Sequence, residues 1–100
     1  MRREQRYRAA LAEVDRLVAR FHQIDPGLGR VVLFGSLAQG VPRNPDFDID
    51  LSFEGREYYR CVAEALNSEF DVDLVDYRVA ADHIREAIDR DGRVVYAPDV

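Results

Sequence analysis

The chain has 100 residues, of which 47% are apolar and 33% charged, enough for one compact domain with a core but not for two. Its formal net charge is -5, which disfavours direct nucleic-acid binding, because such binding depends on neutralising phosphates. All fourteen basic residues are arginine, which excludes a lysine nucleophile and the lysine of a P-loop.

The chain shows no targeting or redox signature. Charges interrupt the apolar residues of the N-terminal segment, and no stretch approaches the ~18 consecutive apolar residues of a membrane span. The single cysteine, Cys61, lies in a helical pattern and is expected in the core or at its boundary. His22 and His83 have no Cys or His at ligand spacing and are expected near the surface. We expect one cytoplasmic domain over residues 1–100.

The first half of the chain predicts one long helix and two strands. Residues 4–24 have apolar side chains at three- and four-residue steps, which indicates an amphipathic helix. Residues 30–34, RVVLF, are typical of a short buried strand, followed by a Gly-Ser turn and a loop with two prolines. Residues 46–53, DFDIDLSF, alternate strictly between polar and apolar and predict a strand buried on one face.

The second half of the chain predicts helices alternating with strands. The expected elements are a helix over 56–69, a strand over 71–77, a helix over 80–91 capped by Gly92, and a final strand over 93–96. The apolar positions of the first of these helices include Leu66, which we expect to face the core. The fold class is therefore α+β, with a small mixed sheet packed with helices.

The stretch DFDIDL places three carboxylates, Asp46, Asp48 and Asp50, on one face of the predicted strand. Each is two residues from the next, which corresponds to about 6.7 Å along a strand. One such aspartate is ordinary surface, but three like charges need compensation, and a divalent cation with oxygen ligands such as Mg²⁺ provides it. An EF-hand calcium loop also has aspartates at this spacing. Leu51 stands where that loop needs glycine, and prolines replace the incoming helix, so the EF-hand is excluded.

The glycine-rich turn GSLAQG has the glycine spacing of a P-loop but not its chemistry. Val41 and Pro42 stand where a P-loop has Lys and Ser or Thr. What remains is a strand that ends in Gly35 and Ser36, whose backbone N–H groups and hydroxyl are able to face a phosphate.

Taken together, FGSLAQG, FDIDLSF and FDVDLVDY resemble the minimal nucleotidyltransferase (MNT) family of the DNA polymerase β-like superfamily, over residues 31–96. The resemblance implies the nucleotidyltransferase fold. It implies that Gly35 and Ser36 grip the terminal phosphates of ATP, and that Asp48, Asp50 and Asp73 are the catalytic carboxylates that hold two Mg²⁺ ions.

Some positions depart from the family pattern. Asp46 and Asp71 fall outside the motif and are expected to be surface or outer charges. Leu37 and Gln39 occupy positions where many members carry arginine, which weakens triphosphate binding; Arg43 in the adjacent loop is a candidate replacement.

The resemblance implies an activity and a partner. Minimal members of the family pair with a HEPN-domain ribonuclease toxin, and the expected reaction moves AMP from ATP to a tyrosine hydroxyl of that toxin, within a hetero-oligomer. The alternative is a non-catalytic antitoxin that neutralises the toxin by complex formation. Transfer to a small molecule is a weaker alternative, because it usually requires an added helical domain.

Overall fold

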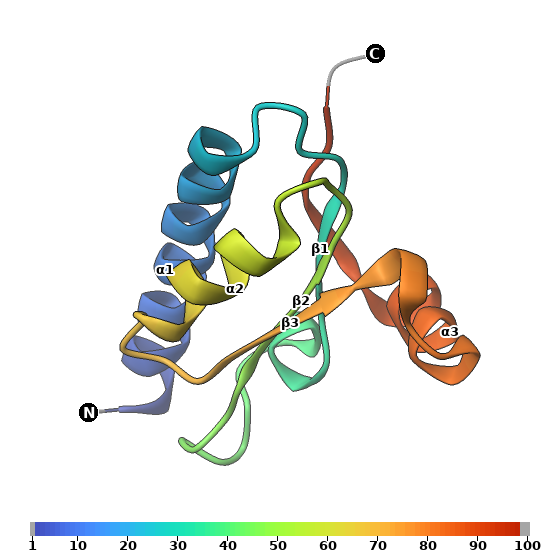
Figure 1. The fold of residues 1–100 in the computed structure, drawn as a ribbon. Coiled ribbons are helices and arrows are strands. Elements are labelled where there is room, and N and C mark those ends of the chain that lie inside the picture. Colours follow the sequence, from blue (N-terminus) through green and yellow to red (C-terminus); the bar gives the residue numbers. More distant parts are fainter. Residues whose placement is uncertain (1, 99–100) are drawn as a thin grey trace.

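The computed structural model describes residues 2–98, and its elements follow the predicted order (Figure 1). The α-helices are α1 (Arg3–Ile24), α2 (Tyr58–Leu66) and α3 (Asp82–Asp91). The strands are β1 (Val31–Phe34), β2 (Ile49–Phe53), β3 (Val72–Asp76) and β4 (Arg93–Tyr96). Short 3-10 helices, Ser36–Gln39 and Tyr77–Val79, follow β1 and β3.

The strands form one mixed sheet in the order β3-β2-β1-β4, which confirms the predicted fold class. β1 is antiparallel to β2 and β4, whereas β2 and β3 are parallel and are joined by α2. The prediction that the second strand starts at residue 46 was wrong, because β2 starts at Ile49. β1 ends at Phe34, which pairs with Asp50, and β3 begins at Val72, which pairs with Ile49, so the residues before Ile49 have no strand partner.

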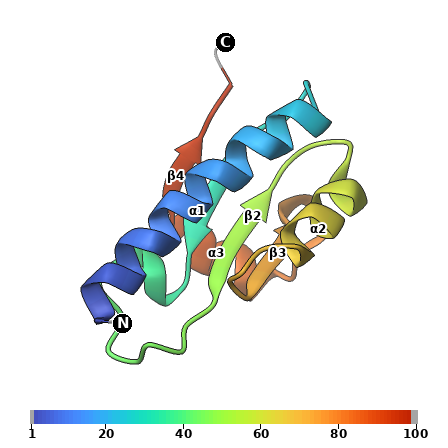
Figure 2. The same cartoon turned by 90° about the vertical axis from the view of Figure 1, so that its left-hand side faces the viewer.

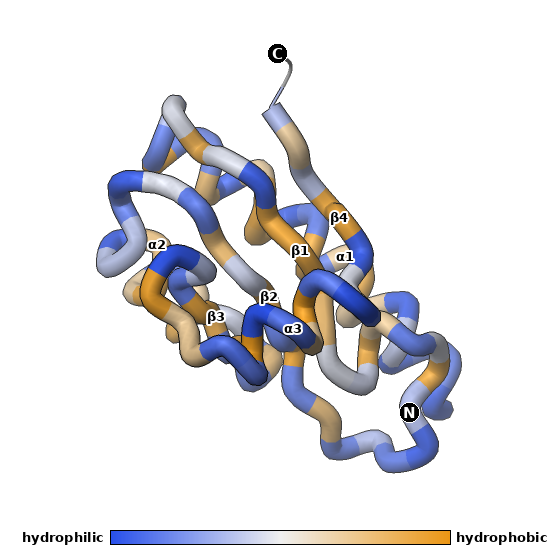
Figure 3. Tube along the Cα trace, turned by 90° about the vertical axis from the view of Figure 1, so that its right-hand side faces the viewer, coloured by the Kyte–Doolittle hydropathy of each residue, from blue (hydrophilic) through white to orange (hydrophobic). Residues whose placement is uncertain are grey.

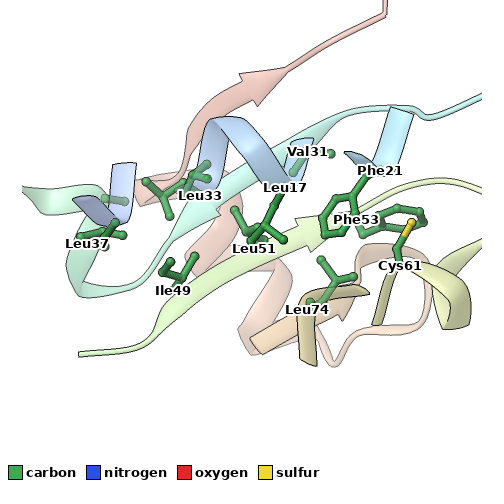
Figure 4. Packing of buried hydrophobic residues seen from close by; sticks show 14 of the residues in the cluster. Leu17, Phe21, Val31, Leu33, Leu37, Ile49, Leu51, Phe53, Cys61 and Leu74 are labelled. Carbon is green, nitrogen blue, oxygen red and sulfur yellow. The ribbon is translucent and has the colours of Figure 1, made fainter. Parts of the chain in front are cut away.

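Helices α1 and α2 cover one face of the sheet (Figure 2). Leu17 and Phe21 of α1 point toward Leu51 and Phe53 of β2 in the core (Figure 4). The rings of Phe21 and Phe53 meet edge to face at 6.0 Å. Each fully buried Leu or Phe contributes about 1.5–3 kcal/mol of hydrophobic stabilisation to this layer. Cys61 of α2 is buried in the same layer, as predicted.

Helix α3 covers the opposite face (Figures 1 and 3), where β1 forms the apolar centre of the sheet. Val32 and Ser52 lie opposite each other on β1 and β2, and both are buried. A Cβ at Gly92, the C-cap of α3, would overlap Val32 and the carbonyl of Ile88. The prediction that β2 has an uncovered polar face was therefore wrong at Ser52, which is buried beside Val32 on the face where α3 packs against β1.

Helix α2 is shorter than the sequence predicted. It runs from Tyr58 to Leu66 and packs through Cys61 and Ala65, which are four residues apart. The exposed fraction of Leu66 is 76%, so the prediction that Leu66 faces the core was wrong. The helix ends at this residue, and its buried face is narrower than the apolar pattern suggested.

Asp25, the C-cap of α1, is a buried carboxylate that joins two distant turns. It accepts hydrogen bonds from the backbone N–H groups of Gly27 at 3.1 Å, Arg56 at 2.8 Å and Glu57 at 3.1 Å. A Cβ at Gly55 would approach the Asp25 carboxylate to 2.5 Å, so this turn requires glycine. Asp25 thereby anchors the end of α1 to the segment that leads into α2.

The helices, the cysteine and the two histidines were also subjects of prediction. No helix within residues 2–98 is long and apolar enough to cross a membrane. Burial raises the pKa of the Cys61 thiol to about 11, so this thiol stays protonated near neutral pH. His22 and His83 are exposed, as predicted.

Candidate active site

Gly35 and Ser36 lie where β1 ends and the first 3-10 helix begins. Gly35 has a φ of 75°, and a Cβ at this position would overlap Oδ2 of Asp50. Both the backbone conformation and the close approach therefore require glycine. Ser36 is exposed, whereas Leu37 is buried in the core. The turn presents Ser36 to solvent directly beside the Asp50 carboxylate.

The strand register brings two of the predicted carboxylates together. Asp50 of β2 lies beside Asp73 of the parallel strand β3, although 23 positions separate them in the chain. Neighbouring strands are about 4.8 Å apart, and paired residues of a parallel ladder project from the same face. Asp48 directly precedes β2, two residues before Asp50, and is exposed, as is Asp73. The sequence-predicted carboxylates thus occupy adjacent positions at one end of β2.

Asp50 is in an unfavourable environment for a carboxylate. Burial, followed by the negative charges of Asp73 and Asp48, raises the pKa of Asp50 to about 6 from 3.8. Among the described residues no side chain forms an ion pair with Asp50. Ionisation of Asp50 therefore costs folding free energy near neutral pH. A pKa raised by burial and like charges is typical of a functional carboxylate.

The donor chemistry of these residues fits Mg²⁺, which prefers carboxylate oxygens together with substrate phosphates. Among the described residues, no three side chains of His, Cys, Asp or Glu lie close enough together to hold a metal ion without rearrangement. Asp48 and Asp73 are exposed, so their side chains have room to rotate toward Asp50. The assignment of metal ligands to Asp48, Asp50 and Asp73 stays a prediction.

A pocket of about 490 Å³, here called the β1–β2 pocket, opens beside this cluster. Its lining residues are Ser36, Pro42, Arg43, Asn44, Asp46, Phe47, Asp48 and Asp50. Arg43 is therefore beside the predicted phosphate-binding turn, and its carbonyl accepts a hydrogen bond from Arg3 of α1 at 3.3 Å. The pocket brings one cationic side chain next to the aspartates, as phosphate binding requires.

The two additional aspartates occupy different positions. Asp46 is exposed and lines the β1–β2 pocket, and its backbone N–H donates to the side chain of Asn44 at 2.9 Å. Asp71 is exposed, and its carbonyl accepts the N–H of Ile49 at 2.8 Å, which starts the β2–β3 ladder. The surface position expected for both is observed, and their functional roles stay predictions.

A second groove, which the sequence motifs did not predict, lies along the outer edge of β3. It has a volume of about 510 Å³ and includes Asp73. Tyr58 of α2 donates a hydrogen bond from its hydroxyl to the Leu74 carbonyl at 2.5 Å. Tyr59 beside it is 84% exposed. The groove forms where α2, β3 and the segment after β3 meet in space, so periodicity alone carries no signal for it.

The family model described as "Polymerase beta, Nucleotidyltransferase" matches residues 18–100. The chain belongs to this nucleotidyltransferase family. The match includes the Gly-Ser turn and all three predicted carboxylates, in agreement with the resemblance of the sequence motifs to polymerase β-like enzymes.

Solved structures share the nucleotidyltransferase fold. A toxin–antitoxin structure with AMP-PNP is 25% identical, with a TM-score of 0.64 over 85% of this chain and 74% of that chain. A complex of the tri-AMPylated Shewanella oneidensis HEPN toxin with MNT antitoxin gives 19% identity and a TM-score of 0.59, covering 97% of this chain and 74% of that chain. A Sulfolobus solfataricus protein assigned as a nucleotidyltransferase has 17% identity and a TM-score of 0.67, covering 95% of this chain and 86% of that chain. No curated protein sequence matches the chain.

Proposed function

We propose that this nucleotidyltransferase is a Mg²⁺-dependent protein adenylyltransferase that moves AMP from ATP to a hydroxyl of a partner protein. The observation that carries the proposal is the pairing of Asp50 with Asp73 across β2 and β3, beside the turn that presents Ser36. This arrangement raises the pKa of Asp50 and destabilises its ionised form. Such a cost is typical of a functional site rather than of a surface with only a structural role.

Each site residue has a role in this proposal. Asp48, Asp50 and Asp73 would hold the Mg²⁺ ions. The positive charge of these ions would offset the negative charges of the triphosphate and of the carboxylates. Gly35 and Ser36 bind the terminal phosphates through a backbone N–H and a hydroxyl. The acceptor oxygen bonds to the α-phosphorus, the bond to the β-phosphate oxygen breaks, and pyrophosphate leaves. Asp73 accepts the hydroxyl proton.

Arg43 takes the place of the cations that the turn lacks. Many resembling proteins carry arginine where this chain has Leu37 and Gln39, and Leu37 here fills the core. Arg43 lines the same pocket as Ser36 and Asp50, and none of the described carboxylates forms an ion pair with it. Its guanidinium is therefore available for a phosphate, for which the planar fork is well suited.

The proposed acceptor is a tyrosine of a cognate HEPN-domain toxin, with which the protein forms a hetero-oligomer in the cytoplasm and acts as the antitoxin. Two similar structures support this partner: one is described as a toxin–antitoxin with AMP-PNP and another as a tri-AMPylated HEPN toxin with MNT antitoxin. The net charge of -5 supports a protein acceptor over direct binding of nucleic acid.

The test compares two aspartates two residues apart. The protein is co-purified with its HEPN-domain partner and incubated with labelled ATP and Mg²⁺. The wild type and Asp46→Ala are expected to label the partner, whereas Asp48→Ala loses more than about 100-fold in rate, since even outer partners of metal ligands contribute 10–100-fold. An unlabelled partner in the presence of folded wild-type protein would refute the proposal.

A second function, neutralisation by complex formation without catalysis, is favoured by the uncharged Leu37 and Gln39 of the turn. The variant with Asp48, Asp50 and Asp73 all changed to Asn distinguishes the two functions. If this variant still suppresses toxicity in cells, occlusion is sufficient; if suppression is lost while the complex still forms, AMP transfer is required.

A further inference from the structure

We infer that the groove on the outer edge of β3 receives the side chain that carries the acceptor hydroxyl, on the opposite side of the carboxylates from ATP. This inference rests on the proposed function. The groove, here called the β3-edge groove, is lined by Arg56, Tyr58, Tyr59, Asp73, Leu74, Val75, Asp76, Arg78, Val79 and Ala80.

The position of the groove suits an in-line reaction. Asp50 lines the β1–β2 pocket, Asp73 lines the β3-edge groove, and the two residues are neighbours across the parallel strands. Attack on the α-phosphorus requires the entering and leaving oxygens to lie on opposite sides of that atom. With the triphosphate beside Ser36 and Arg43, the acceptor has to approach from the β3 side.

The charges of the two cavities also fit ATP in the β1–β2 pocket and the acceptor in the β3-edge groove. The β1–β2 pocket has three aspartates against one arginine, which suits a triphosphate only together with cations. The β3-edge groove has two arginines and two aspartates, and Arg78 pairs with Asp76 at 3.6 Å while it donates to the carbonyl of Gly55. The groove is therefore close to neutral and suits an uncharged side chain.

The walls of the groove favour an aromatic side chain of the partner over a partner strand that pairs with the free edge of β3. Tyr59 and Val79 are 84% and 80% exposed, and both line the groove, so their side chains are accessible to an apolar ring at its rim. The Tyr58 hydroxyl already binds the Leu74 carbonyl, which caps the middle of the free edge of β3. A tyrosine ring of the partner packs against Tyr59 and Val79 and directs its hydroxyl toward Asp73.

The experiment compares exposed apolar residues inside and outside the groove. Tyr59→Ser combined with Val79→Ser removes the rim, and Leu66→Ser changes another exposed residue of α2 that does not line the groove. AMP transfer to the co-expressed HEPN-domain protein, the affinity for that protein and the affinity for ATP with Mg²⁺ are measured for each variant. We expect the double variant to raise the KM for the partner about tenfold, with ATP affinity unchanged, and Leu66→Ser to behave as the wild type.

The outcomes separate this inference from the proposed function. If the wild type transfers AMP and the double variant has the same KM, or if Leu66→Ser is equally impaired, the inference is wrong and the function stands. If the wild type transfers no AMP, the proposed function fails. In that case the groove is judged by the affinity of the complex, and an affinity unchanged in the double variant overturns the inference as well.

Discussion

Asp25 and Asp50 are both withdrawn from solvent, yet their surroundings are opposite. Asp25 is 3% exposed and accepts three backbone hydrogen bonds, so its charge is compensated by the fold. Asp50 is half-buried beside Asp48 and Asp73, and its pKa rises to about 6. The first carboxylate stabilises a junction between α1 and the start of α2. The second is destabilising in its ionised form unless a cation compensates it, as the proposed function requires.

The largest expected effect is on the structural carboxylate. Asp25→Ala leaves the N–H groups of Gly27, Arg56 and Glu57 without their acceptor, and each lost partner costs about 1–3 kcal/mol when its donor stays buried. We expect the free energy of unfolding to fall by about 3 kcal/mol in urea denaturation. Asp15→Ala, an exposed aspartate of α1, serves as control; an equal loss in both variants would remove the structural role of Asp25.

Gly35→Ala tests how closely the turn approaches Asp50. Its positive φ and the overlap of a Cβ with the Asp50 carboxylate are expected to cost about 2 kcal/mol and to displace Asp50, so AMP transfer is lost. Gly40→Ala is the matched control, because Gly40 has a φ of 120° but nothing within 4 Å of an added Cβ. We expect strain but continued transfer in that variant. Equal activity of the two variants would contradict a role for the contact with Asp50.

Asp50→Asn is expected to stabilise the protein while it abolishes transfer. The folded-state pKa lies above the usual value, so protonation favours folding, and this contribution is lost as the pH rises from about 4 through about 6. After allowance for solvent screening, the variant gains about 1–2 kcal/mol at pH 7.5 and almost nothing at pH 4. Urea denaturation across this pH range, with exposed Asp46→Asn as control, checks the result. A gain that does not depend on pH would disprove the charge repulsion.

The smallest effect is expected at Ser52, on the same strand as Asp50. Its hydroxyl is buried and has no hydrogen-bond partner within residues 2–98. Ser52→Ala removes an uncompensated polar group at little change in volume, so we expect thermal stability to stay the same or rise by up to about 1 kcal/mol. A loss of stability would mean that Ser52 has a partner, such as a buried water, that offsets its burial.

Local patterns predicted the element order well, because helix and strand periodicity depends on residues close in the chain. The helix from residue 4 to 24 and the final strand over 93–96 agree with α1 and β4 within one residue. Errors occurred where distant partners decide the outcome. β2 starts three residues later than predicted because its pairing with β3 begins at Ile49 and its pairing with β1 only at Asp50, and Leu66 is exposed at the end of α2.

The sequence by itself determined the class of the fold, and it predicted the residues for the chemistry: the Gly-Ser turn, Asp48, Asp50 and Asp73. Only the tertiary structure decided that Asp50 and Asp73 are neighbours, that Ser52 is buried, and that a groove opens beside β3. It also separated Asp25, which the sequence does not distinguish from any surface aspartate, from the carboxylates of the site. The reason is physical: residue type and spacing carry local preference, whereas burial and charge repulsion depend on segments that meet only after folding.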